Sequence, residues 1–335
     1  MTGLPLVIGG AGFIGSALVR LLVADGMVRV LDDMSTGSAA NLAGLNGVDL
    51  VEGSLLDDDA LRRSMQGATL IFHLACLGVR HSIHQPVANH QVNAFGTLKI
   101  LEAARQLEVD RVVYVSTSEV YGTAKRVPMD EDHPTWPHTV YGGAKLAGEA
   151  YTRAYHVTYG LPTVVIRPFN SYGPRSHHEG DSGEVIPKFV VRARNGLSPI
   201  IFGDGSQSRD FTYVEDTARA IGAAGKSPDV IGETVNVGSG GETTILELAR
   251  IVTTAARRPD LLPEFHEPRP GDVLRLHADS ARAGRLLGWR PEVGLAEGVD
   301  RLLAWHEEQG TDWARALQQD VAHNWEGAVA TGAAT

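Results

Sequence analysis

Short apolar runs alternate with amphipathic segments along the first half of the chain. Runs rich in Val, Ile and Leu predict buried strands at residues 4–8, 28–31, 48–52, 70–74, 111–116 and 163–167. Apolar residues at helical spacing predict helices at about 13–24, 58–66, 90–107 and 141–159. Because buried strands that alternate with helices are typical of parallel sheets, we expect an α/β fold with a doubly wound parallel sheet.

A glycine-rich turn joins the first strand to the first helix. Gly9, Gly12 and Gly15 follow the apolar run directly, and a strand, a turn with glycines at this spacing and a helix form the dinucleotide-binding unit of a Rossmann-type sheet. Glycine permits the tight turn and lets backbone N–H groups approach a pyrophosphate at the positive end of the helix. We expect Phe13 and Ile14, within this unit, to contact the cofactor as well.

Two carboxylates at the end of the second strand indicate which dinucleotide binds. Asp32 and Asp33 follow the run Val28–Leu31, about 20 residues beyond the glycines, where an acidic residue bonds the adenosine ribose. A carboxylate at this site would repel a 2′-phosphate. The predicted cofactor is therefore NAD rather than NADP.

The composition of the chain changes after Arg167-Pro168, where Gly and Pro become frequent. We expect an NAD-binding domain over residues 1–168, a substrate-binding region over 169–325 and a frayed tail over 326–335. The segments 211–214 and 234–237 resemble strands, so elements of about 211–238 are expected to return to the sheet.

Composition excludes several classes of protein. Net charge is −10 and the basic residues are scattered, so we expect no nucleic-acid or membrane partner. Cys76 is the sole cysteine, which excludes an internal disulfide. His177 and His178 are adjacent on a polar loop without further ligands at metal-binding spacing, so no metal site is predicted. No apolar run reaches the ~20 residues that span a bilayer, and strand-like sequence begins close to Met1, so a cytoplasmic location is expected.

Tyr141 and Lys145 open a helical pattern and lie four residues apart, on one face of the helix. An ammonium group beside a phenol favours the phenolate, so we expect Lys145 to lower the pKa of Tyr141 for work as a base. The run Ser116-Thr117-Ser118-Glu119 follows a predicted strand, so its side chains should reach the carboxyl edge of the sheet, where open α/β folds bind ligands.

With these motifs the chain resembles the extended short-chain dehydrogenase/reductase family, in its branch of nucleotide-sugar epimerases, dehydratases and decarboxylases. The resemblance implies that Tyr141 is the catalytic base, that Lys145 supports it and binds the nicotinamide ribose, and that Thr117 bonds the reacting sugar oxygen. It further implies a homodimer built from the helices around 90–107 and 141–159.

The resemblance also extends to other binding residues. Leu74 and Ala75 match a family strand that lines the cofactor, and Asn93 matches a family asparagine that either contacts the cofactor region or supports the backbone. The substrate contacts that it implies are Ser118, Asn170, Arg175, Arg209, Arg269 and Asp272. Two guanidiniums on one pyrophosphate fit the bidentate geometry of arginine. Arg80 is expected on a loop near the sugar, either on a substrate carboxylate or in solvent.

The branches of the family share a 4-ketosugar and differ in the next step. Dehydratases usually have an Asp-Glu pair after the threonine, whereas this chain has Ser118-Glu119. A lone Glu119 resembles the uronate decarboxylases, but the Arg-Pro-Gly-Asp stretch at 269–272 resembles the epimerases. We therefore favour 4-epimerisation of a nucleotide-linked hexose, with a UDP-sugar as the expected substrate, over decarboxylation or dehydration through Glu119. A non-catalytic NAD-binding protein is the alternative of another class, and the intact Thr117, Tyr141 and Lys145 oppose it.

Overall fold

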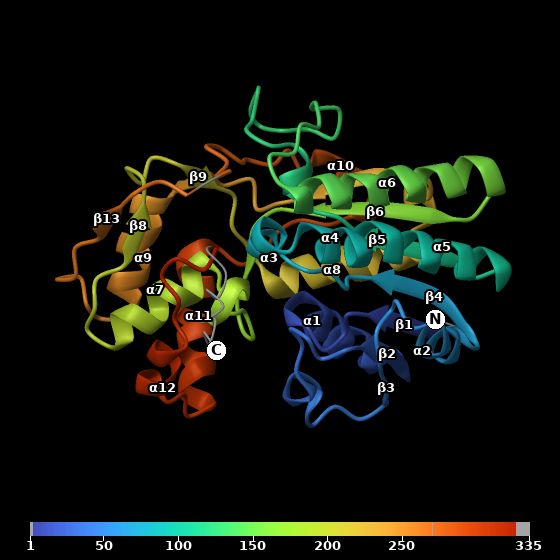
Figure 1. The fold of residues 1–335 in the computed structure, drawn as a ribbon, viewed down its shortest axis with the longest axis horizontal. Coiled ribbons are helices and arrows are strands. Elements are labelled where there is room, and N and C mark those ends of the chain that lie inside the picture. Colours follow the sequence, from blue (N-terminus) through green and yellow to red (C-terminus); the bar gives the residue numbers. More distant parts are fainter. Residues whose placement is uncertain (1–2, 270, 326–335) are drawn as a thin grey trace, which may run out of the picture.

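The computed structural model describes residues 3–269 and 271–325. Its centre is a seven-stranded parallel sheet with the strand order β11-β6-β5-β4-β1-β2-β3 (Figure 1). The strands are β1 (Leu4–Ile8), β2 (Val28–Asp32), β3 (Val48–Glu52), β4 (Ala68–His73), β5 (Arg111–Val115), β6 (Thr163–Pro168) and β11 (Thr234–Val237). The order reverses between β1 and β4, which confirms the predicted doubly wound Rossmann-type fold.

Helices cover both faces of this sheet because successive strand residues point to opposite sides. In β1, Val7 packs into the core beneath α1 (Phe13–Leu22) and α8 (Val214–Lys226), whereas Leu6 and Ile8 face the other core. That second core is covered by α2 (Asp58–Met65), α5 (Gly96–Gln106) and α6 (Val140–Tyr159). The predicted strands and the predicted helices that became α1, α2 and α6 agree with the structure to within a few residues, whereas α8 was not predicted.

The predicted helix at 90–107 is divided into three pieces in the structure. α4 (Pro86–His90) leads into a π-helical turn, η3 (Gln91–Phe95), and α5 follows it. A second difference precedes them, because α3 (Val79–His84) is a short helix where the sequence predicted a loop. Arg80 therefore lies on a helix rather than on a loop.

The later part of the chain forms a smaller lobe on the left in Figure 1. Its helices are α7 (Val185–Arg194), α9 (Ile245–Ala255), α11 (Leu295–Glu308) and α12 (Trp313–Gln318). α10 (Ala281–Leu287) instead packs against β11 of the main sheet and against α8. Its short strands pair as β7 (Ser171–Tyr172) with β10 (Thr212–Tyr213), β8 (Ile200–Phe202) with β13 (Glu264–His266), and β9 (Ser208–Arg209) with β12 (Thr243–Thr244). A separate apolar core that includes Phe189, Leu248 and Leu302 supports this lobe.

One of the two segments expected to return to the main sheet does so. β11 pairs in parallel with β6, whereas the strand expected at 211–214 shrinks to β10 and pairs with β7 outside that sheet. The reason is that α8 begins at Val214 and that Phe211 and Tyr213 pack in the core of the smaller lobe. No helix within 3–269 or 271–325 is long and apolar enough to cross a membrane. The predicted frayed tail lies outside the described residues, and the boundary at 168 stays a prediction.

Candidate functional site

A single cavity of about 600 Å³ runs from the glycine turn to the smaller lobe. At one end it is lined by Gly9, Gly12, Phe13, Ile14, Gly15, Asp32, Asp33, Leu74 and Ala75, all predicted to contact the cofactor. It continues past Tyr141, Lys145, Thr117, Ser118 and Glu119 to Arg80, Asn170, Arg209, Arg269 and Asp272. The structure therefore gathers residues from distant parts of the sequence at the carboxyl edge of the sheet.

The glycine turn leaves room for a bound group because side chains are excluded from it. Gly9 has φ +85°, and a Cβ at this position would lie 2.5 Å from the backbone nitrogen of Ala75. A Cβ on Gly15 would lie 2.0 Å from the carbonyl oxygen of Gly9. No side chain caps α1 after Gly12, so its first N–H groups are available to an anion. This cradle fits the pyrophosphate of a dinucleotide.

Asp32 lies in the cavity wall beside the glycine turn. Its carboxylate accepts hydrogen bonds from the backbone nitrogens of Ala11 at 2.8 Å and Met34 at 3.0 Å. Burial raises the pKa of Asp32, while these N–H donors act in the opposite direction. Asp33, the next residue, accepts hydrogen bonds from Ser35. Both carboxylates line the cavity, as expected of groups that meet an adenosine ribose.

Tyr141 lies in the first turn of α6, where the Thr139 hydroxyl caps the helix by accepting a hydrogen bond from Gly142. One turn later, Lys145 donates a hydrogen bond from Nζ to the Val115 carbonyl at 2.6 Å. Burial raises the pKa of Tyr141 well above its usual range and lowers that of Lys145. Desolvation is the largest influence on the phenol in this structure, and the hydrogen bond with Thr117 acts in the opposite direction. The lowering of the Tyr141 pKa by Lys145 stays a prediction.

Several charged side chains line the other end of the cavity. Arg209 forms an ion pair with Asp272 at 2.6 Å, and Arg80, Glu119 and Glu184 line the same space. Burial raises the pKa of Glu119, which is opposed by the nearby cations Arg209 and Arg80. Asn170 Oδ1 and Arg269 Nε are buried without a hydrogen-bond partner within the described residues. These unpartnered polar atoms fit a site that binds a polar anion.

Two predicted residues are absent from the cavity wall. Asn93 exchanges hydrogen bonds with the backbone of Leu77 and bonds Asn89, so it supports the segment after β4. Arg175 has φ +70°, and the charged or ionisable groups that influence its pKa are Arg20, Glu215 and Tyr213. The structure therefore gives Arg175 no contact with the cavity to which the sequence assigned it.

Sequence reasoning missed several residues that line the cavity. Glu184, at the start of α7, lines the cavity, and its side chain accepts no capping hydrogen bond from that helix. Burial raises the pKa of its carboxyl to about 7. Phe202, from β8, and Trp325, near the end of the described chain, add aromatic rings. No local motif marks these three residues, since only tertiary packing brings them to the site. Within 3–269 and 271–325, no group of three or more His, Cys, Asp or Glu is placed to hold a metal ion.

Comparisons with known proteins agree on one family. Residues 6–302 match the family model described as GDP-mannose 4,6 dehydratase. A UDP-glucose 4-epimerase of Mycolicibacterium smegmatis is 42% identical over 301 residues, which are 88% of this chain and 95% of that protein. A dTDP-glucose 4,6-dehydratase of Streptomyces niveus is 34% identical over 333 residues, covering 95% of this chain and 96% of the relative.

A similar solved structure is the UDP-glucose 4-epimerase of Thermotoga maritima with UDP-glucose. Its TM-score is 0.87 at 33% identity, and the match covers 92% of this chain and 100% of that one.

Proposed function

Because the chain belongs to the extended short-chain dehydrogenase/reductase family, we propose that it is an NAD-dependent 4-epimerase of a nucleotide-linked hexose. One observation supports this proposal most directly. A single cavity joins the glycine cradle, the Tyr141–Lys145 pair and the cationic end with Arg209 and Arg269. This order suits a dinucleotide and a nucleotide sugar that meet at Tyr141. Similarity to UDP-glucose 4-epimerases favours a UDP-sugar as substrate.

When bound in the glycine cradle, NAD+ would supply the hydride acceptor for C4 of the sugar, and its positive nicotinamide ring would favour the phenolate of Tyr141. Tyr141 removes the C4 hydroxyl proton, and Thr117 orients the same oxygen. Lys145, fixed on the Val115 carbonyl, places its positive charge beneath the site. Asp32, Arg209 and Arg269 line the cavity, which supports a role for Asp32 at the adenosine ribose and for the two arginines at the substrate diphosphate. Epimerisation then requires the planar ketone to turn over before the hydride returns to its other face.

The lyase reactions are the second candidate. Glu119 is the observation that favours them, because its carboxyl lines the cavity beside Thr117 and burial raises its pKa, which suits a proton donor. The dehydratase relatives point the same way. An acid at this position could serve the loss of water, and decarboxylation of a uronate would pass through the same 4-ketosugar.

The first prediction concerns the tyrosine. The purified protein with NAD+ is expected to convert UDP-glucose to its C4 epimer at unchanged mass, which NMR couplings and mass spectrometry would establish. Tyr141→Phe should lower turnover about 10²–10⁴-fold because it removes the acid–base group. Tyr159→Phe, exposed on the same helix, is the control and should keep full activity. Loss of water from UDP-glucose, or loss of carbon dioxide when UDP-glucuronate is supplied instead, would replace the epimerase proposal with a lyase. Full activity of Tyr141→Phe would refute the role of this phenol.

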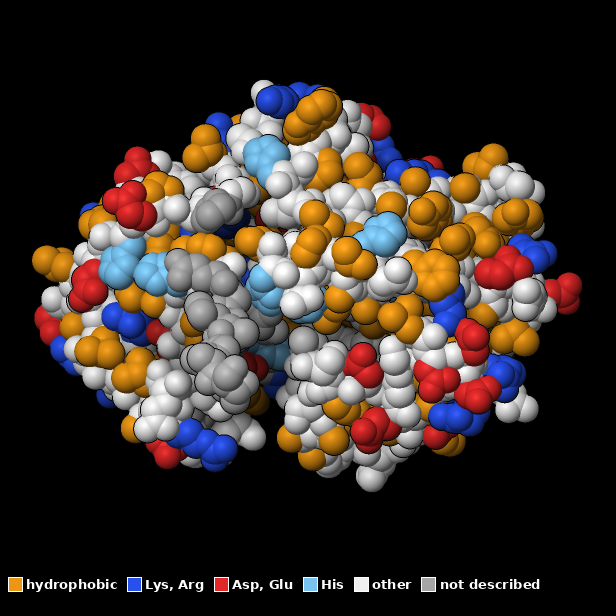
Figure 2. Space-filling model, viewed as in Figure 1, with side chains coloured by type: hydrophobic (Ala, Val, Ile, Leu, Met, Phe, Trp, Pro, Cys, Tyr) orange, Lys and Arg blue, Asp and Glu red, His pale blue; other side chains and the backbone are white. Residues whose placement is uncertain are grey.

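We further propose that the protein is a homodimer. Val140, Ala150, Ala154 and Val157 lie at helical spacing on α6 and are exposed, and Val157 has 82% of its surface exposed. Phe95, on the adjoining η3, is also exposed. Figure 2 shows hydrophobic side chains gathered over the region where Figure 1 places α5 and α6. An apolar face of this kind is typical of a homodimer interface.

A further inference from the structure

The last described residues of the chain form part of the cavity wall. Trp325 lines the same cavity as Tyr141 and is nearly buried. Its ring meets that of Phe202 edge to face, with centroids 4.8 Å apart and an interplanar angle of 86°. Two rings at this angle form a corner, in which a flat ring can stack on one wall and meet the other with its edge.

The segment 319–325 is attached to the smaller lobe by polar contacts. The Asn324 side-chain amide donates hydrogen bonds to the carbonyl oxygens of Gly180 at 3.0 Å and Gly183 at 3.3 Å. Asp320 is buried and forms ion pairs with Lys188 at 3.2 Å and Arg192 at 3.6 Å, both on α7. These contacts fix the position from which Trp325 reaches the cavity.

Arg269 connects this corner to the charged part of the cavity. Its guanidinium carbon lies 4.7 Å from the ring centre of Phe202 and 5.6 Å from that of Trp325, which are cation–π distances. No ion pair to Arg269 is found within the described residues, and its buried Nε is unpartnered. Burial and the nearby cation Arg80 lower the pKa of Arg269 to about 9. An anion beside Arg269 would relieve this repulsion.

The position of the corner suits one part of a nucleotide sugar. β2, with Asp32 at its end, and β8, with Phe202, lie on opposite sides of the molecule in Figure 1. A sugar at Tyr141 and a diphosphate at Arg209 and Arg269 would leave the nucleobase at the end that Phe202 and Trp325 line.

We propose that Trp325 is a nucleobase-binding residue and that segment 319–325 is an integral wall of the substrate site. The inference rests on the proposed function, because it assumes that the ligand is a nucleoside diphosphate sugar. Stacking of a base on an aromatic ring corresponds to about a 5-fold to 150-fold difference in affinity.

The test measures equilibrium binding of UDP, dTDP, GDP, inorganic pyrophosphate and NAD+ by calorimetry, in the full-length protein. Trp325→Ala should weaken the preferred nucleoside diphosphate by about 10-fold or more, and Trp325→Phe should restore most of that loss. Pyrophosphate and NAD+ should bind Trp325→Ala as they bind the unmodified protein. Trp136→Ala is the matched control, since Trp136 is 71% exposed and does not line the cavity.

Two results would overturn the inference. Unchanged nucleoside diphosphate affinity in Trp325→Ala would remove the base contact, and an equal loss of pyrophosphate affinity would show that Trp325 only supports Arg269. The proposed function fails separately, if the unmodified protein binds none of the three nucleoside diphosphates.

Discussion

Glu184 lies in the cavity wall at the start of α7, where burial raises the pKa of its carboxyl to about 7 and His177 and Arg80 only partly oppose that rise. The unfolded value is about 4.3. Between about pH 4.3 and about pH 7 the folded protein therefore keeps the proton of Glu184, which the unfolded chain has released. The protonated carboxyl contributes favourably to the free energy of unfolding. This contribution is fully present below about pH 4 and is lost as the pH rises through about 7.

The second prediction follows from that sign. Glu184→Gln keeps a neutral, similarly shaped side chain at every pH, so it should raise the melting temperature at pH 8 by about 2–4 °C and change it little at pH 5. Thermal unfolding of both proteins from pH 5 to 9 measures the difference. Glu267→Gln, on an exposed loop, is the control and should show no such pH dependence. Equal shifts at pH 5 and pH 8 would contradict the prediction.

Residues in local motifs could be placed from the sequence, whereas residues delivered by distant segments could not. Gly9, Gly15 and Tyr141 reach the cavity because a strand, a turn and a helix start fix their positions locally. Trp325 depends on the contacts of Asn324 with residues more than 140 positions earlier in the chain. The raised pKa of Tyr141 could not be predicted from the sequence either, because it depends on how deeply the fold buries the phenol.

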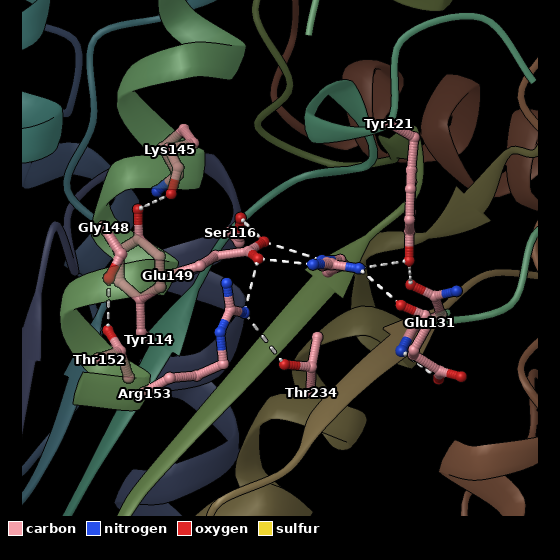
Figure 3. A network of polar contacts seen from close by, with 12 residues as sticks. Tyr114, Ser116, Tyr121, Glu131, Lys145, Gly148, Glu149, Thr152, Arg153 and Thr234 are labelled. Carbon is pink, nitrogen blue, oxygen red and sulfur yellow. Dashed lines mark hydrogen bonds and ion pairs between the residues drawn. The ribbon is translucent and has the colours of Figure 1, made fainter. Parts of the chain in front are cut away.

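At the scale of elements, a buried ion pair joins α6 to β6. Two nitrogens of Arg167 donate to Glu149, at 2.8 Å and 2.6 Å. Ser116, directly after β5, donates to the same carboxylate (Figure 3). Burial alone would raise the pKa of Glu149, but the hydrogen bonds from Arg167, Ser116 and Arg153 hold it below its usual value. The pair therefore fixes the helix that bears Tyr141 and Lys145 against the sheet.

The third prediction is that Glu149→Ala lowers the free energy of unfolding by about 3–5 kcal/mol, because it leaves the Arg167 guanidinium buried without its counter-ion. Urea unfolding followed by circular dichroism measures the loss. Arg153→Ala removes the partly exposed partner of the same carboxylate and should cost less than about 1 kcal/mol. Similar losses in the two variants would show that the buried Arg167–Glu149 pair contributes no more to stability than the partly exposed Arg153–Glu149 pair.

The elements themselves were predicted well where their signal is long and local. β1 to β6 and α6 follow from apolar runs and helical spacing, and the structure moves their ends by only a few residues. The division of residues 86–106 could not be predicted, because the spacing of apolar residues does not distinguish one π-helical turn from a continuous α-helix. The two-residue strand β7 has no such signal because tertiary pairing alone defines it, and the same pairing leaves β10 shorter than the strand expected at 211–214.

At the scale of the whole molecule, two lobes with separate cores meet along one cavity. The glycine turn and the proposed catalytic residues come from the sheet lobe, and Arg209, Arg269 and Trp325 come from segments after β6. The sequence indicated both regions and, through the family resemblance, named Asn170, Arg209, Arg269 and Asp272, which line the cavity. It did not indicate all the side chains of the second region that face the first. That choice depends on how the lobes pack, as the placement of Arg175 off the cavity wall illustrates.

The fourth prediction tests the proposed dimer through the exposed apolar stripe on α6. Ala154→Arg places a charged side chain in the middle of that stripe, and Arg is nearly as good a helix former as Ala, so the monomer should still fold. Light scattering after size exclusion should show the unmodified protein as a dimer and the variant mainly as a monomer at micromolar concentration. Ala304→Arg, at an exposed position on α11, is the matched control and should stay dimeric. A monomeric unmodified protein would contradict the proposed dimer. A variant that stays dimeric would show that α6 does not form the interface, because burying an unpaired guanidinium there costs more free energy than such an apolar face can offset.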